Sequence, residues 1–241
     1  ANKFNIIDKP NERSSHKFIT LRGGGIIFPL GLIIPLLFVD NIDSYWPLLL
    51  GVFAISVISF LDDVITLSNK YRIIVHFSSV ALLLYQLNLF SDNLFLLLPA
   101  FVLVVGVINA YNFMDGINGM TGGFNLVLML LLWYVDYSIV DFSSGSLIIY
   151  LIFSLLIFNF FNFRTKAKCF AGDVGAFSLG FVVVFLLLQL ISKTGNPAWI
   201  GLLAVYGVDT ILTIIHRIIL RENIIQPHRR HLFQVLVNEC G

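Results

Sequence analysis

Residues 171–192 read Ala171-Gly-Asp173-Val-Gly-Ala-Phe-Ser-Leu-Gly180-Phe-Val-Val-Val-Phe-Leu-Leu-Leu-Gln-Leu-Ile-Ser192. An acid with glycines on either side leads into an apolar run of spanning length, since a helix needs about 20 residues to cross a bilayer. Further apolar stretches of roughly that length lie at 24–39, 45–61, 73–89, 93–110, 120–135, 145–163 and 197–220. The sequence therefore predicts an all-α, polytopic integral membrane protein with about eight transmembrane helices.

The composition excludes a soluble protein. Hydrophobic residues make up 58% of the 241 residues and charged residues only 12%, about half of the charged fraction of a soluble domain. A net charge of +1 and the lack of a basic arm give no support to a nucleic-acid partner. The two cysteines, Cys169 and Cys240, fit no metal-binding or redox spacing. The partner that the composition predicts is the lipid bilayer.

The basic residues predict which helix ends face the cytoplasm. When eight spans are drawn, only Lys193 of the 15 Lys and Arg residues falls in a loop on the opposite side. Lys and Arg are enriched in the cytoplasmic loops of membrane proteins. The sequence therefore predicts one transmembrane domain over residues 1–241, with cytoplasmic loops at 1–22, 62–72, 111–119, 164–173 and 221–241.

Two polar clusters on this predicted face indicate ligand binding. The first reads Asn109-Ala-Tyr-Asn112-Phe-Met-Asp115-Gly-Ile-Asn118-Gly119, and we expect a loop in which side-chain and backbone groups converge on a polar ligand. The second is Asp62-Asp63, which directly follows an apolar run. Adjacent carboxylates suit Mg²⁺, a cation that binds one or two protein acids together with phosphates. A pair of solvated acids at a helix end is the alternative.

Asp173 and a histidine segment add two more candidate sites. A helix N-terminus favours an anion through its free N–H groups, whereas an aspartate at that position also suits an N-cap. The histidine segment reads Pro227-His228-Arg229-Arg230-His231-Leu-Phe-Gln234. Histidines three residues apart share a helix face, and with the neighbouring arginines they favour a diphosphate clamp over a zinc site.

Other ionisable residues lie within or beside the apolar stretches. Asp209 is predicted about ten residues, roughly 15 Å, inside the last span, with His216 and Arg217 on the same helical face. It is either a functional acid or part of an internal charged link between helices. Arg72 and His76, four residues apart, are expected to pair with the Asp62–Asp63 loop.

Five motifs follow one another along the chain: Asp8-Lys-Pro-Asn-Glu-Arg13-Ser-Ser-His16 with Gly23-Gly-Gly25, Leu61-Asp-Asp63, Asn109–Met120, Phe170-Ala-Gly-Asp-Val-Gly175 and His228–Gln234. In this order they resemble the polyprenyl-phosphate N-acetylhexosamine-1-phosphate transferase family, in its O-antigen and teichoic-acid initiating branch. Asn118 departs from several branches of the family, which have a second aspartate there. Because that family has ten or eleven spans, the chain resembles a fragment of such a protein.

The resemblance implies transfer of N-acetylhexosamine 1-phosphate from a UDP-N-acetylhexosamine to undecaprenyl phosphate, with release of UMP. It implies a bacterial cytoplasmic (inner) membrane protein whose active site faces the cytoplasm, with Mg²⁺ as cofactor and Mn²⁺ as its alternative. Whether the enzyme forms a homodimer is left open. The implied catalytic residues are Asp62, Asp63, Asp173, His228 and His231, and the implied metal ligands are Asp173 and Asp63. The implied substrate-binding residues are Asn109, Asn112, Asp115, Asn118, Phe170, Arg72 and Arg229.

A secondary transporter is the main alternative from another functional class. Such a protein concentrates ionisable residues near the middle of the bilayer, at interrupted helices. Asp209 alone fits that pattern in this sequence, and nothing resembles an inverted repeat. The sequence therefore favours the membrane transferase.

Overall fold

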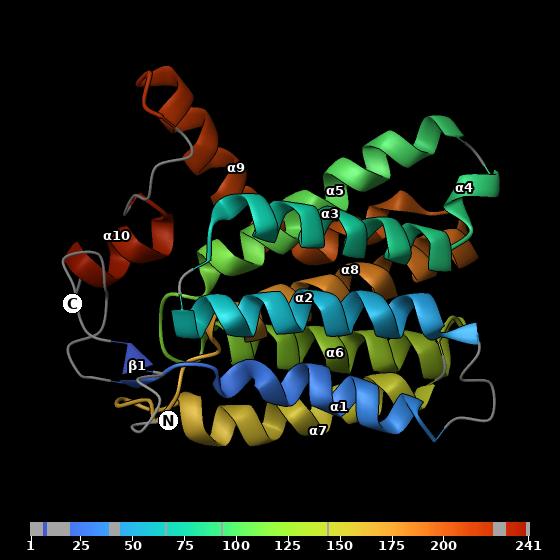
Figure 1. The fold of residues 1–241 in the computed structure, drawn as a ribbon, viewed down its shortest axis with the longest axis horizontal. Helices are drawn as coiled ribbons and strands as arrows, with labels where there is room; N and C mark the ends of the chain where they lie inside the picture. The colour runs from blue at the N-terminus through green and yellow to red at the C-terminus, as the bar shows by residue number, and fades with distance from the viewer. Residues whose placement is uncertain are drawn as a thin grey trace.

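A computed structural model describes residues 7–8, 20–38, 44–65, 67–92, 94–143, 145–223 and 230–239. The fold is a bundle of helices (Figure 1). The helices are η2 (Gly24–Ile26), α1 (Ile27–Leu36), α2 (Trp46–Ile65), α3 (Asn69–Gln86), α4 (Leu89–Asp92), α5 (Leu94–Met114), α6 (Met120–Ser138), α7 (Gly145–Asn162), α8 (Gly172–Thr194), η4 (Pro197–Leu203), α9 (Ala204–Ile219) and α10 (Leu232–Glu239).

The eight apolar stretches of the sequence correspond to helices, which confirms the predicted fold class. Within the described residues, five helical segments are long and apolar enough to cross a membrane: Trp46–Ile65, Phe95–Met114, Met120–Ser138, Gly172–Thr194 and Pro197–Ile219. Shorter apolar helices cover Gly24–Leu36 and Ser146–Asn162. The remaining apolar stretch, 73–89, belongs to α3. The 18 residues of this helix include Asn69, Lys70 and Arg72 in the first turn, which makes it less apolar than the other long helices.

Helix α8 is the central element of the bundle. Its residues from Val174 to Leu188 are all buried, and it packs against α1, α2 and α5. The other long helices expose one face each, as expected for helices in contact with lipid. The apolar composition of α8 on every side is therefore explained by burial within the protein.

The start of α8 lies against the segment that leads into α1. The N–H groups of Gly24 and Gly25 donate to the carbonyls of Phe170 and Ala171, and the N–H of Phe170 donates to the carbonyl of Leu21. A Cβ added to Gly25 would lie 2.3 Å from the Cα of Gly175. The glycines thus allow the backbone before α1 to approach the backbone at the start of α8. At Gly175 the close neighbour is Gly25 rather than a ligand.

A two-stranded antiparallel sheet lies beside this junction, and the sequence did not predict it. Strand β1 (Ile7–Asp8) pairs with β2 (Thr20–Leu21), and Leu21 forms a further parallel bridge with Cys169. Figure 1 shows β1 next to the end of the bundle where α2 finishes. Arg22, which follows β2, lies 4.0 Å from Asp63 near the end of α2, whereas residues 9–19, with most of the first motif, lie outside the described residues.

Candidate active site

One arginine joins acids from two helices. Arg72, in the first turn of α3, places Nη1 2.7 Å from Oδ2 of Asp62 and Nη2 3.2 Å from Oδ2 of Asp173. Asp62 lies near the end of α2, where its other oxygen accepts from the N–H of Leu67 at 2.6 Å. The predicted pairing of Arg72 with the Asp62–Asp63 loop is confirmed for Asp62, and the arginine also holds the acid at the start of α8.

Asp63 caps α8 from outside that helix. Its two carboxylate oxygens accept from the N–H groups of Asp173 and Val174, each at 3.2 Å. The side chain is only 1% exposed, and the guanidinium of Arg22 lies 4.0 Å away. Gly172 precedes these amides with φ +71°, and a Cβ there would lie 2.7 Å from Oδ2 of Asp63. Asp173 is therefore not the N-cap of α8, because an acid of α2 takes that role.

Asp115 brings a second carboxylate to the same helix end. It accepts from the hydroxyl of Thr121 at 2.8 Å and from the N–H of Gly172. Burial raises the pKa of the Asp115 carboxyl from 3.8 to about 6, although both hydrogen bonds lower it. The prediction that α8 offers free N–H groups to a bound anion is wrong for its first turn, because Asp63 and Asp115 occupy them.

The predicted polar loop is shorter than expected. Helix α5 continues to Met114, so Asn109 and Asn112 are helical and only residues 115–119 form the loop. The amide of Asn109 donates to the carbonyl of Val105, one turn earlier in the same helix. This internal bond satisfies the polar side chain and lets an apolar helix extend through it.

Two asparagines hold the neighbouring loop in place. The Nδ2 of Asn118 donates to the carbonyls of Arg164 and Thr165 at 3.0 and 3.3 Å. Asn162, which the sequence analysis missed, accepts from the N–H of Gly119 and donates to the carbonyl of Cys169. These contacts fix the backbone that leads to Phe170. The structure thus gives Asn118 a positioning role, and its predicted contact with substrate stays a prediction.

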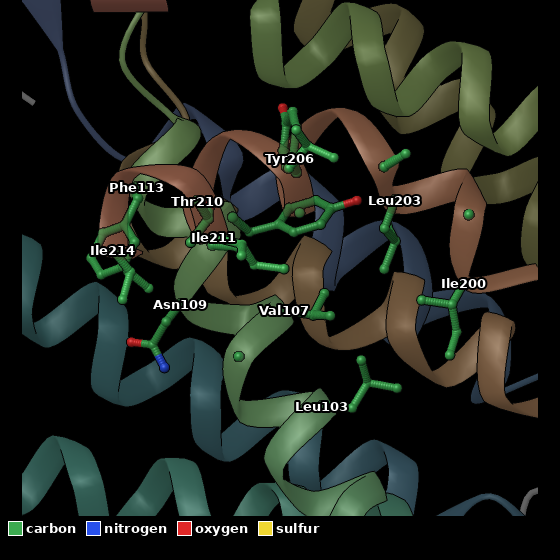
Figure 2. A pocket seen from close by; sticks show the side chains of 17 residues that line it. Leu103, Val107, Asn109, Phe113, Ile200, Leu203, Tyr206, Thr210, Ile211 and Ile214 are labelled. Carbon is green, nitrogen blue, oxygen red and sulfur yellow. The ribbon is translucent and has the colours of Figure 1, made fainter. Parts of the chain in front are cut away.

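An apolar groove lies between α5 and α9 (Figure 2). Its volume is about 480 Å³. Asn109, Phe113 and Ile214 lie around one end, whereas Leu103 and Ile200 lie toward the other. Its lining is almost entirely apolar, and Phe113 is only two residues from Asp115. The groove therefore follows α5 from Leu103 to Phe113, close to the point where the helix ends at Met114.

The histidine segment is only partly described. His231 is buried and precedes α10, so it does not share a helix face as predicted, while His228 and Arg229 lie outside the described residues. The ring of His231 lies 5.8 Å from that of Phe113 on α5. Burial lowers the pKa of His231, with Asp209 acting in the opposite direction.

Asp209 of α9 contacts the described part of this segment through both of its carboxylate oxygens. Its Oδ2 lies 3.3 Å from Nδ1 of His231, and its Oδ1 accepts from the N–H of Leu232 at 2.7 Å. The acid therefore links α9 to α10, a partner that its sequence spacing to His216 and Arg217 did not indicate. With that role, Asp209 gives the transporter alternative no support.

The acids present a donor set that suits Mg²⁺, which prefers carboxylate oxygens. Asp173 is the best placed of them, because its side chain is 26% exposed and neither of its oxygens is described as accepting a backbone N–H. Asp63 is less accessible, since both of its oxygens already accept backbone N–H groups. Among the described residues no group of three or more His, Cys, Asp and Glu could hold a metal by itself. A cation here would need phosphate oxygens to complete its shell.

Comparison with known proteins places this cluster in a family. The sequence model of glycosyl transferase family 4 matches residues 45–191, which include Asp62, Asp63, Asp115 and Asp173. The chain belongs to glycosyl transferase family 4. The matched range contains the whole arrangement around Arg72 and the start of α8.

Relatives from several bacteria align with nearly all of this glycosyl transferase family 4 chain. The chain is 28% identical over 256 residues to a probable undecaprenyl-phosphate N-acetylglucosaminyl 1-phosphate transferase of Bacillus subtilis, covering 98% of this chain and 71% of the relative. Undecaprenyl-phosphate alpha-N-acetylglucosaminyl 1-phosphate transferases of Escherichia coli K12 and Haemophilus influenzae are 24% and 28% identical over 261 and 262 residues. These alignments cover 98% of this chain and 70% and 73% of the two relatives.

The raised pKa of Asp115 predicts a pH-dependent cost to stability. Stability from a carboxyl whose pKa is raised by folding is greatest below 3.8 and falls as the pH rises through about 6. Asp115→Asn keeps an acceptor for Thr121 and removes the charge. Relative to wild type, the variant should therefore gain about 2 kcal/mol between pH 4.5 and pH 7.5. Melting temperatures in detergent and magnesium-free buffer measure this gain, and an equal difference at both pH values would contradict it.

Proposed function

We propose that this chain transfers N-acetylglucosamine 1-phosphate from UDP-N-acetylglucosamine to undecaprenyl phosphate and releases UMP. The observation that carries the proposal is the convergence of Asp62 and Asp173 on Arg72 in a chain of this family, which also has an apolar groove between α5 and α9. The proposed reaction initiates a cell-surface polysaccharide. The relatives' names supply the sugar and the lipid.

The two substrates differ in the kind of surface that each one needs. A polyprenyl phosphate is an apolar chain with an anionic head, whereas a nucleotide sugar is polar throughout. The groove between α5 and α9 offers an apolar wall for the lipid chain, and the ring of Phe113, at one end of it, lies 5.8 Å from that of His231. We place the reaction on the cytoplasmic face, because the basic residues gather on that side.

The lipid phosphate acts as the nucleophile. One of its oxygens attacks the β-phosphorus of the nucleotide sugar, the bond from that phosphorus to the bridging oxygen breaks, and UMP leaves. A phosphate monoester has its second pKa near ~6, so it is mostly dianionic at pH 7 and needs no strong base. We therefore assign Asp62 to positioning and polarising the lipid phosphate through Arg72, rather than to obligatory proton removal.

The protein must offset the repulsion between two anionic substrates. Arg72 and Arg22 supply positive charge beside the acids, and a Mg²⁺ ion held by Asp173 would stabilise the charge that develops on the transferred phosphoryl group. Asp63 keeps the start of α8 and hence Asp173 in place. Asn112 and Asp115 remain our candidates for the nucleotide, with Phe170 for the uracil ring.

The proposed roles of the histidine segment complete the site. His231 lies against Phe113, close to the groove. We assign His228, Arg229 and His231 to the diphosphate and sugar, because charged donors make short, strong hydrogen bonds to phosphate oxygens.

Asp173→Asn tests the site. Because the variant loses the carboxylate best placed to hold a cation, UMP release from UDP-N-acetylglucosamine should fall about 100-fold or more. Asp136→Asn is the matched control, since Asp136, near the end of α6, also accepts from backbone N–H groups, those of Phe142 and Ser143, but lies outside the acid cluster. The assay uses membranes that contain the protein, undecaprenyl phosphate and Mg²⁺. Equal turnover in both variants would remove Asp173 from the site, and absence of UMP with wild type would reject the function.

Gly106→Leu tests the groove. Nothing lies within 4 Å of a Cβ added at Gly106, which lines the groove, so the larger side chain should fill the groove with little strain. The KM for undecaprenyl phosphate should rise roughly tenfold, a loss of about 1.4 kcal/mol, while the KM for the UDP-sugar changes less than twofold. Val102→Leu, on an exposed part of the same helix, is the control. A rise in the KM for the UDP-sugar alone would contradict the assignment.

A further inference from the structure

Helix α9 carries a buried polar face that the proposed reaction does not use. Asp209, Thr213 and Arg217 are four residues apart and therefore lie on one side of the helix. They are 8%, 5% and 3% exposed. Because a buried charge is costly unless it is paired, the partners of these residues show what the face is built to hold.

Asp209 holds the start of α10. Its Oδ1 accepts from the N–H of Leu232 at 2.7 Å, and Leu232 is the first residue of that helix. The first N–H groups of a helix have no partner within the helix, and a carboxylate beside them also interacts favourably with the helix dipole. Asp209 therefore caps α10 from a separate helix.

The same carboxylate faces the ring of His231. Its Oδ2 lies 3.3 Å from Nδ1, and the ring is buried between Phe113 and Phe233, with centroids 5.8 Å from each. A carboxylate this close to one ring nitrogen favours a proton on that nitrogen and limits how the ring can turn.

Arg217 extends this connection toward the end of α9. Its Nε lies 3.2 Å from Oε2 of Glu222, and its Nη2 donates to the carbonyl of Asn223. The other oxygen of Glu222 pairs with Arg230 at 2.5 Å. Charged contacts from α9 thus reach the residues on both sides of 224–229, the stretch that contains His228 and Arg229.

We propose that Asp209 is a positioning residue for the transfer reaction, which orients His231 and caps α10 so that the ring of His231 is fixed beside Phe113 at the end of the groove. The proposal rests on the proposed function for its effect on turnover. The capping of α10 is a separate physical consequence and is measurable without any substrate.

Two substitutions separate the two contacts of Asp209. Asp209→Ala removes both acceptors, so the backbone N–H groups of residues 232–239 should exchange with deuterium at least tenfold faster than in wild type. Asp209→Asn keeps an oxygen for the N–H of Leu232, so exchange should stay within threefold of wild type. Asp136→Ala and Asp136→Asn are the controls, and exchange within α8 reports whether the bundle stays folded.

Turnover tests the orientation of His231. Asp209→Asn should lower kcat for UMP release at least tenfold, because an amide no longer provides the charge that faces Nδ1. In a His231→Gln background the same substitution should change kcat less than twofold, because Asp209 acts through His231. A purely structural acid would lower kcat by the same factor in both backgrounds.

Different results overturn the different parts of the account. Unchanged exchange of residues 232–239 in Asp209→Ala, with α8 protected, overturns the capping. Wild-type kcat in Asp209→Asn, or equal losses in both backgrounds, overturns the orientation of His231. If wild type releases no UMP, the proposed function fails, and the exchange rates still decide whether Asp209 fixes α10.

Discussion

The arrangement of the site depends on one buried carboxylate, that of Asp63 at the start of α8. A charge that is 1% exposed is destabilising unless hydrogen bonds and opposite charge compensate it. The N–H groups of Asp173 and Val174 and the guanidinium of Arg22 provide that compensation. In return the contact fixes the end of α2 against the first turn of α8, and the position of Asp173 follows from it.

The start of α8 is filled by the protein's own acids. Asp63 and Asp115 accept its first N–H groups, while Asp173 points to Arg72 together with Asp62. Burial is the main cause of the raised pKa of Asp115, and repulsion by the carboxylate of Asp63 adds to it, which shows the cost of such a site. The site is therefore electrostatically suited to a cation and to the basic residues that bind phosphates, at some expense of stability.

The sequence predicted the bundle well, because spans depend on length and hydropathy, which are local properties. It also identified the acids, since Asp62, Asp63 and Asp173 stand at the ends of apolar runs. The pairing of these acids was mostly not predictable. Asp63 contacts residues 110 and 111 positions away, and no periodicity within α2 indicates which backbone its carboxylate will meet.

Residues that hold other residues of the site in place were the hardest to predict. Asn162 and Thr121 look like ordinary polar residues at helix ends, yet they hold Gly119 and Asp115. Asp209 was recognised as unusual in an apolar span, but its partners, His231 and Leu232, lie more than 20 residues further along the chain. The end of α5 was misplaced because Asn109 and Asn112 suggested a loop, whereas the Asn109 amide bonds within the helix.

The most direct test of the account follows the phosphorus atom between the sugar and the nucleotide. UDP-N-acetylglucosamine labelled with ³²P in the phosphate next to the sugar is incubated with membranes that contain the protein, undecaprenyl phosphate and Mg²⁺. If the protein transfers the sugar 1-phosphate, the label appears in the lipid product and the released nucleotide is unlabelled UMP. Label released as UDP, with unlabelled phosphate on the lipid-linked sugar, would contradict the account.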